Sequence, residues 1–184
     1  MYEFATRADF QRFTRDQTLQ ESASKRITAS RRDPRGATFL SHSSKDDELV
    51  DGAIKVLENH GGTVYIDKVD PTMPPYTNSE TASKLKERVN QCRKFVLLAS
   101  ENSKESRWVP WELGIADGYK SLSRIAIFPT VESNARANWT SWEYIGLYNQ
   151  IVYGDLADYE NKVWMVIDRK RNVATELRRW LTGS

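Results

Sequence analysis

The sequence predicts an α/β fold with a parallel sheet and helices on both of its faces. The first observation is an alternation of four short apolar segments, typical of buried strands, with segments of helical periodicity. The second is that a polar loop follows each of the first three strands. In a parallel sheet these loops gather at one edge, and they lie at 41–46, 67–79 and 100–107. The outline is flavodoxin-like.

The composition is typical of one soluble domain with room for an extra element. The 184 residues include 39% hydrophobic and 28% charged residues, and the net charge is only +2. This charge gives no reason to expect a nucleic acid or a membrane surface as a partner. No apolar run approaches the roughly 20 residues of a membrane helix, and the N-terminus lacks the apolar segment of a signal peptide. Because Cys92 is the only cysteine, no internal disulfide is expected, and the expected localisation is cytoplasmic.

The chain is expected to divide into an N-terminal helical arm with a linker, 1–36, and a main domain, 37–184. A thin apolar stripe predicts a helix over 7–30; it consists of Phe10, Phe13, Leu19, Ala23 and Ile27. The polar stretch 31–36 contains Pro34 and Gly36, which indicates a linker. We expect the arm to pack against the main domain or against a second copy.

The main domain begins as strand, helix and strand in succession. Ser44 or Asp46 can cap the first helix, and a pair of glycines ends it. Strands are expected at 37–40, 63–66, 95–99 and 125–128, the last stopped by Pro129, and helices at 47–60, 80–91 and 108–120. The loop 67–79 holds three prolines, and loops of this length in a compact domain are usually functional.

The pattern weakens in the C-terminal part of the main domain. The segment 131–141 is polar and reads as a loop. Strands are expected at 150–153 and 163–167, and a helix at 173–181.

The residue inventory excludes several kinds of catalytic site. Two histidines and one cysteine are too few for a histidine and cysteine zinc site, so no metal is expected. Neither a glycine-rich phosphate loop nor a G-x-S-x-G motif is present. Any catalysis must therefore depend on carboxylates, hydroxyls, aromatic rings and backbone dipoles.

The segment 106–113 places Trp108 and Glu112 on one face of a helix that follows a buried strand. Its position, just past the carboxyl end of that strand, is where open α/β sheets bind ligands. Because W-x-x-x-E is a loose pattern, its spacing alone favours a packed Trp108 and a solvated Glu112.

Four segments in order resemble Toll/interleukin receptor (TIR) domains, and together they change this interpretation. They are 39–46, 66–68, 92–100 and 106–113. The resemblance covers about 37–129, is closest to bacterial single-domain members, and implies a five-stranded parallel sheet. It also implies that Glu112 is the catalytic carboxylate of an enzyme that cleaves NAD⁺.

In such an enzyme the nicotinamide leaves NAD⁺ as a neutral molecule, so one carboxylate suffices to stabilise the oxocarbenium-like transition state. Ser41, His42 and Ser43 are candidates for hydrogen bonds to ribose or phosphate, with loop and capping roles as the alternative. Asp67 and Lys68 lie at the mouth of the same crevice, where solvated loop charges are the alternative. Trp108 either stacks on nicotinamide or packs in the core.

The resemblance further implies an NAD⁺ glycohydrolase or ADP-ribosyl cyclase in antiphage signalling, with NAD⁺ as substrate and no bound cofactor. The expected partners are further copies of the chain, contacted through the loop 67–79, and an effector protein activated by the product. The sequence departs from the family in its N-terminal arm, in Pro74 and Pro75 where a glycine is common, and in its long region after Thr130.

Two other functions stay open, and one is excluded. A non-catalytic TIR assembly module would keep the fold and use the loop 67–79 as an interface. An enzyme that transfers or hydrolyses nucleosides would use a similar glutamate. A phospho-receiver domain is excluded, because it needs acidic residues where Ser41, His42, Ala99 and Ser100 stand.

Overall fold

The structure, a computed structural model, describes residues 1–67, 79–131 and 143–183. Most of the loop 67–79 and the segment 132–142 therefore lie outside the described residues. The strands are β1 (Tyr2–Glu3), β2 (Ala5–Thr6), β3 (Thr38–Ser41), β4 (Val64–Tyr65), β5 (Lys94–Ala99), β6 (Ile125–Val131), β7 (Asn149–Gly154), β8 (Val163–Asp168) and β9 (Val173–Glu176). The helices are α1 (Arg7–Thr14), α2 (Leu19–Ser30), α3 (Asp47–Asn59), α4 (Ser79–Gln91), α5 (Glu101–Lys104), α6 (Trp108–Tyr119) and α7 (Leu177–Thr182). Short 3₁₀ helices lie at Leu122–Arg124 and Glu143–Leu147.

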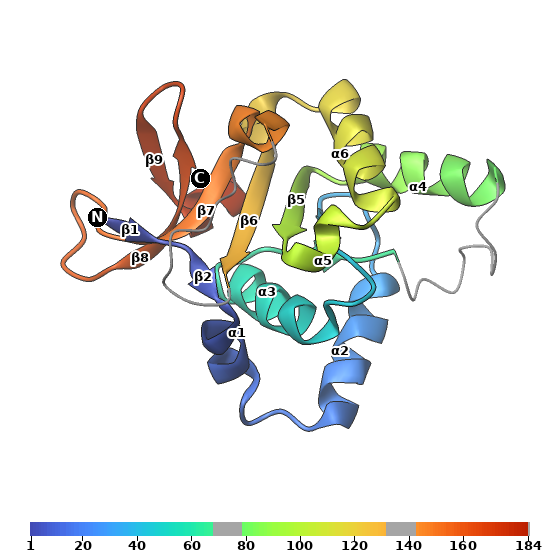
Figure 1. Ribbon diagram of the computed structural model, residues 1–184, viewed down its shortest axis with the longest axis horizontal. Helices are drawn as coiled ribbons and strands as arrows, with labels where there is room; N and C mark the ends of the chain where they lie inside the picture. The colour runs from blue at the N-terminus through green and yellow to red at the C-terminus, as the bar shows by residue number, and fades with distance from the viewer. Residues whose placement is uncertain (68–78, 132–142, 184) are drawn as a thin grey trace.

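The described strands form one sheet in the order β4-β3-β5-β6-β7-β8-β9 (Figure 1). The five strands from β4 to β7 pair in parallel, so the predicted five-stranded parallel sheet is confirmed as the centre of the molecule. β8 and β9 extend the sheet with antiparallel pairs, and the expected strands at 150–153 and 163–167 are β7 and β8. β1 pairs antiparallel with β7, and β2 pairs in parallel with β6.

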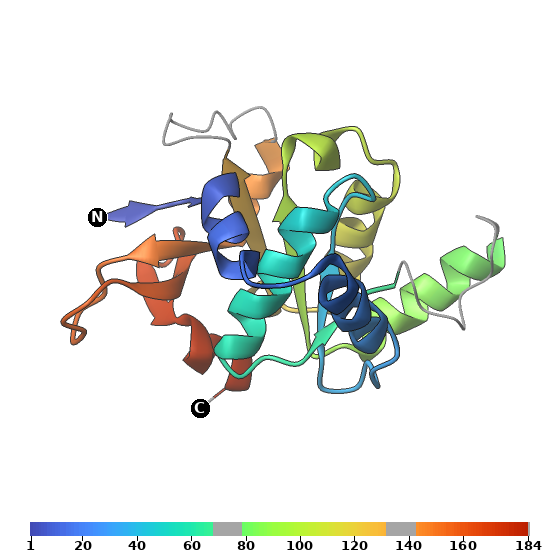
Figure 2. The same cartoon turned by 90° about the horizontal axis from the view of Figure 1, so that it is seen from below.

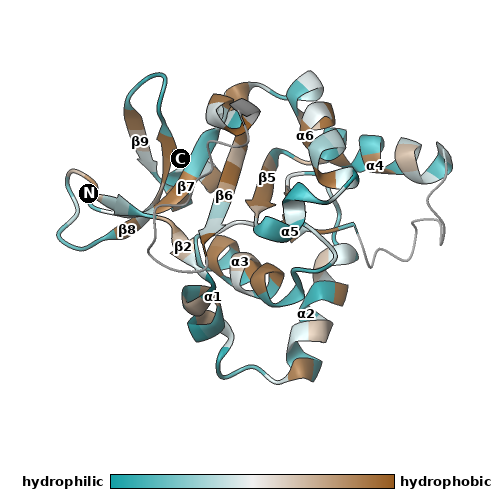
Figure 3. Ribbon diagram, in the orientation of Figure 1, coloured by the Kyte–Doolittle hydropathy of each residue, from teal (hydrophilic) through white to brown (hydrophobic). Residues whose placement is uncertain are grey.

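Helices cover both faces of the sheet, as the sequence predicts. Alternate residues of each strand point to opposite faces, so Leu40 lies in one apolar cluster with α3, while Phe39 lies in the other with α4 and α6. The largely apolar β5 lies between these layers (Figure 3). Within the part of the chain that the structure describes, no helix has the length and apolar character to cross a membrane.

The N-terminal arm differs from the single helix that the sequence predicts. It forms α1 and α2, because Thr18 caps a second helix in a box with Glu21. The predicted apolar stripe is wrong beyond Phe13, since Leu19 is 92% exposed and Ile27 is 43% exposed. The arm nevertheless packs against the rest of the chain through Phe10, which is fully buried, and α1 lies beside α3 in both views (Figures 1 and 2).

Three predictions in the main domain need correction. The segment 173–181 is not one helix: its first residues pair with β8 as β9, and α7 begins at Leu177, where the Glu176 side chain caps it. β6 runs through Pro129 to Val131, because Pro129 still lies opposite Ala99 and β2 pairs with β6 just beyond it. The predicted loop after β5 contains the short helix α5.

Candidate functional site

Ser41 and Glu112 meet at the carboxyl edge of the parallel sheet. Ser41 is the last residue of β3, and Glu112 lies one turn inside α6. The Ser41 hydroxyl donates a hydrogen bond of 2.5 Å to the Glu112 carboxylate, Oγ to Oε2. Ser41 is fully buried and Glu112 is 4% exposed, so the two side chains form a buried pair and Glu112 is not the solvated acid that its spacing alone favoured.

The sheet register explains how residues 71 positions apart come together. β3 and β5 are parallel neighbours, and Ser41 lies opposite Leu97. The chain leaves β5 at the same edge, turns through α5, and returns as α6. Val109 and Leu113 of α6 are buried in the cluster with Phe39, which fixes the helix over β3 and β5 and turns Glu112 toward Ser41.

The first two residues of the loop after Ser41 are also buried. His42 and Ser43 are each 4% exposed. His42 Nδ1 lies 3.0 Å from the carbonyl oxygen of Leu40, which can only accept, so Nδ1 carries the proton in this contact. The Ser43 hydroxyl accepts a long bond of 3.4 Å from the Lys45 amide, and the Ser43 carbonyl accepts from Asp46. These contacts support the loop role that was the alternative for both residues.

A second buried contact joins this loop to the start of α5, and no pattern in the sequence predicts it. Asp46 precedes α3 but makes no side-chain capping bond. Its carboxylate instead accepts hydrogen bonds of 2.5 Å from the Ser100 hydroxyl and 2.6 Å from the Asn102 amide. In the sequence, Ser100 and Asn102 are recognisable only as polar residues that follow a buried strand. That polar character is the one sequence feature that points to their contact with Asp46. The contact holds two loops of the carboxyl edge together.

Trp108 and Asp67 lie less deeply than the Ser41–Glu112 pair. Trp108 is partly buried, packs against the apolar cluster beneath α6, and meets Trp111 edge to face at 5.3 Å. Trp108 therefore packs against the core, as one of its two predicted roles requires. Stacking on a ligand stays a hypothesis. Asp67 is partly buried just after β4, the strand next to β3, so it lies at the same edge. Lys68 lies outside the described residues.

The chemical capacity of this edge follows from the buried pair. A carboxylate removed from water stabilises a nearby positive charge more strongly than one in solution, because the surrounding dielectric is low. A carboxylate also accepts hydrogen bonds from sugar hydroxyls, and Ser41 fixes the position of one of its oxygens. Among the described residues no group of three histidine, cysteine or acidic side chains is arranged to hold a metal ion.

Comparisons with known proteins identify the family of the chain. The family model described as TIR domain matches residues 38–166, which includes β3, α6 and the Ser41–Glu112 pair. The chain is also 34% identical over 146 residues to a protein of Bacillus cereus (strain MSX-D12) named "Probable 3' cyclic ADP-D-ribose synthase ThsB'". That similarity covers 78% of this chain and 74% of the relative. The chain therefore belongs to the TIR domain family.

Proposed function

We propose that this protein cleaves the nicotinamide–ribose bond of NAD⁺ and that it releases the ADP-ribosyl part as a cyclic product or as ADP-ribose. The observation that carries the proposal is the buried hydrogen bond between Ser41 and Glu112 at the carboxyl edge of the sheet. The relative named as a cyclic ADP-ribose synthase supports the cyclic product.

In the proposed reaction the bond between the ribose carbon C1 and the nicotinamide nitrogen breaks, and its electron pair leaves with nicotinamide. The pyridinium nitrogen thereby becomes neutral, so the reaction needs no acid to protonate the leaving group. Positive charge develops on the ribose ring, and the Glu112 carboxylate stabilises it. Ser41 is proposed as a positioning residue, since its hydroxyl holds Oε2 of that carboxylate in place.

The ribosyl cation is then captured by an oxygen nucleophile, which loses its proton. Capture by water gives ADP-ribose, and capture by a hydroxyl of the second ribose in the same molecule gives a ring. Burial of the site favours the ring, because it limits the access of water to the cation.

We assign the remaining substrate contacts to the residues that surround the pair. His42 and Ser43 follow Ser41 in a buried loop and are proposed to bond ribose or phosphate oxygens. Asp67, with Lys68 after it, would contact the ribose from the end of β4, and Trp108 would cover the nicotinamide. We further propose cytoplasmic antiphage signalling, in which the product activates an effector protein.

The test replaces Glu112 with glutamine, which is nearly the same shape and carries no charge. We expect Glu112→Gln to lose about a hundredfold or more of the NAD⁺ cleavage rate, because the amide cannot offset the developing positive charge. Chromatography of NAD⁺ incubations measures the products, and the melting temperature reports the fold. Glu160→Gln, at an exposed position, serves as the matched control and should keep full activity.

The same incubations separate the other two functions. Release of free base from nucleosides, with NAD⁺ left intact, would identify a nucleoside hydrolase. Intact NAD⁺ at every protein concentration would identify an assembly module. Near-normal turnover by Glu112→Gln would remove Glu112 from the catalytic role.

A further inference from the structure

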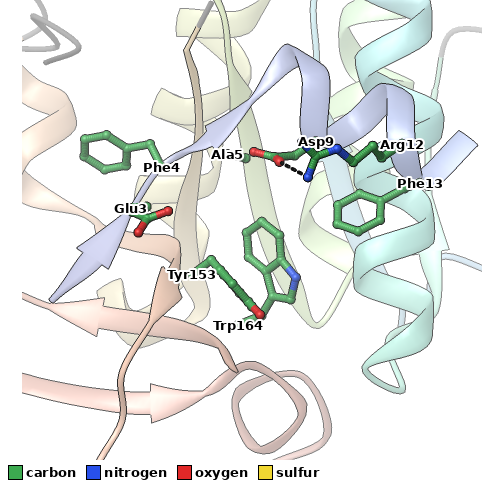
Figure 4. A pocket seen from close by; sticks show the side chains of 8 residues that line it. All are labelled: Glu3, Phe4, Ala5, Asp9, Arg12, Phe13, Tyr153 and Trp164. Atoms are coloured by element: carbon green, nitrogen blue, oxygen red, sulfur yellow. Dashed lines mark ion pairs between the residues drawn. The ribbon is translucent and has the colours of Figure 1, made fainter. Parts of the chain in front are cut away.

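A cavity of about 370 Å³ lies between the N-terminal arm and the strands β7 and β8 (Figure 4). It shares no lining residue with the Ser41–Glu112 pair. Its lining residues are Glu3, Phe4, Ala5, Asp9, Arg12, Phe13, Tyr153 and Trp164. Most of them precede residue 38, where the match to the TIR family begins, so the arm makes this cavity a feature beyond the family fold.

Backbone pairing builds the walls of the cavity. Tyr2 and Glu3 pair with Gly154 and Tyr153, and Ala5 pairs with Thr130 at the end of β6. Gly154 permits this approach, because a Cβ atom there would lie 2.5 Å from the carbonyl oxygen of Met1. The arm is thus held on the sheet on both sides of Phe4, and the cavity is part of the fold.

Aromatic rings supply the apolar surface of the cavity. The Trp164 indole lies at its centre, with Tyr153 on one side and Phe13 on the other (Figure 4). The ring centroid of Trp164 is 5.4 Å from that of Tyr153 and 6.3 Å from that of Phe13. Trp164 also meets Phe128 edge to face, with their ring centroids 5.4 Å apart. Fixed rings around a cavity of this size favour a flat ligand that contacts their faces.

The charged residues of the cavity already have partners of opposite charge, which disfavours a strongly charged ligand. The Glu3 carboxylate pairs with Lys162 at 2.6 Å, and Asp9 accepts hydrogen bonds from Thr6 and faces Arg12 at 3.8 Å. Each carboxylate therefore has a cation beside it. Arg12 would repel an ammonium ion, and the two carboxylates would repel a phosphate. The loose Asp9–Arg12 pair still offers an acceptor and donors to the edge of a ring.

We propose that this cavity is a second binding site, which takes a planar, uncharged nitrogen heterocycle of the size of nicotinamide or adenine. The ring would stack on Tyr153 and contact Trp164 at an angle, because these two rings are tilted by 50° from one another, and its amide or amino group would bond the Asp9–Arg12 pair. The proposal does not depend on NAD⁺ cleavage, since the site uses none of the residues assigned to that reaction.

The test follows the indole N–H signal of Trp164 by NMR while nicotinamide or adenine is added to the full chain. We expect a saturable shift with either compound. Tyr153→Ser should weaken the affinity about tenfold, because one stacking face is lost. The Tyr153 side chain is 37% exposed, so this change is expected to leave the fold intact. Tyr159→Ser, a similarly exposed tyrosine outside the cavity, is the matched control and should bind normally.

Further titrations make the proposal falsifiable. Glu112→Gln should bind the heterocycles as the parent does, which separates this site from the candidate active site. Choline and AMP should bind at least tenfold more weakly, because the lining carboxylates already face Lys162 and Arg12, and because Arg12 repels an ammonium ion and the carboxylates repel a phosphate. The absence of a shift with both heterocycles, equal binding by Tyr153→Ser, or tighter binding of choline would each overturn the proposal.

Discussion

Lys94 is a buried amine for which the described residues provide no carboxylate partner. It is 8% exposed at the start of β5, and its Nζ atom lies 4.2 Å from the ring centroid of Trp180. Burial, followed by the positive charges of Arg93 and Arg124, lowers the pKa of Lys94 from 10.5 to about 8. The fold therefore favours the neutral amine. When Lys94 is protonated, its buried charge lowers the free energy of unfolding.

This shift predicts how stability depends on pH. Between about pH 8 and pH 10.5 the unfolded chain binds the Lys94 proton and the folded chain does not, so the free energy of unfolding rises with pH in that window. Lys94→Met lacks this contribution. We expect the stability of the parent relative to Lys94→Met to rise by on the order of 1 kcal/mol between pH 7.5 and pH 10.

Urea unfolding at several pH values measures the difference in free energy of unfolding between the parent and Lys94→Met. Groups that titrate in both proteins contribute equally and cancel. Lys170→Met, at an exposed position, is the control and should show a constant difference from the parent. A difference between the parent and Lys94→Met that is flat with pH would contradict the assigned shift.

At the scale of elements, the contact between α1 and α3 decides where the N-terminal arm lies. Phe10 of α1 is fully buried and meets Phe128 of β6 edge to face at 5.3 Å. It passes over Gly52 of α3, where an added Cβ atom would lie 2.7 Å from the Phe10 Cβ atom. A glycine inside a helix weakens that helix, and here its absent side chain makes room for an aromatic ring.

This contact predicts a non-additive pair of substitutions. Phe10→Ala should reduce the free energy of unfolding by about 3–5 kcal/mol, because it leaves a cavity. Gly52→Ala should reduce it by about 1–3 kcal/mol, because the methyl group and the ring overlap. The double variant should lose less than the sum, since Phe10→Ala removes the ring atoms from the overlap and leaves only the contact with the Cβ atom of residue 10, and the methyl group added by Gly52→Ala fills part of the cavity. Urea unfolding of the four proteins tests this, and additive losses would show that the two residues do not interact.

For the molecule as a whole, the candidate active site lies at the carboxyl edge of the sheet, the edge at which β4 ends. The loop 67–79 follows β4 at this edge, and its sequence contains Met73, Pro74, Pro75 and Tyr76. Such a cluster is unusually apolar for a surface loop, and prolines reduce the entropy lost when a loop becomes ordered at an interface. We therefore keep the prediction that copies of the chain assemble through this loop.

Assembly predicts that the NAD⁺ cleavage rate per molecule rises with protein concentration. Replacing Met73 and Tyr76 together with serine should flatten that rise and leave the melting temperature nearly unchanged. Sedimentation of both proteins over the same range gives the oligomeric state. A rate per molecule independent of concentration, equal in parent and variant, would describe a self-sufficient monomer.

The central sheet and the candidate catalytic carboxylate could both be predicted from local patterns in the sequence. β3, β5 and β6 have apolar runs that only a doubly covered sheet can bury, and the segment around Glu112 carries a family pattern. These signals are local, because they depend on residues that are adjacent or one helical turn apart. The same holds for α3, α4 and α6, whose apolar residues recur at helical spacing.

The contacts between distant segments could not be predicted, because they depend on how the strands are arranged in space. The Ser41–Glu112 bond and the Asp46–Ser100 bond depend on which strands are neighbours, and the sequence spacing of the partners carries no sign of it. The sequence of β9 predicts a helix. Its backbone instead forms hydrogen bonds with the open edge of β8, and this pairing outweighs the local preference for a helix. The position of the arm likewise depends on packing, because Gly52 of α3 leaves room for Phe10, whereas its division into two helices follows from the local capping box of Thr18 and Glu21. Local propensities are worth tenths of a kcal/mol per residue, so burial and pairing against a distant segment decide wherever the two disagree.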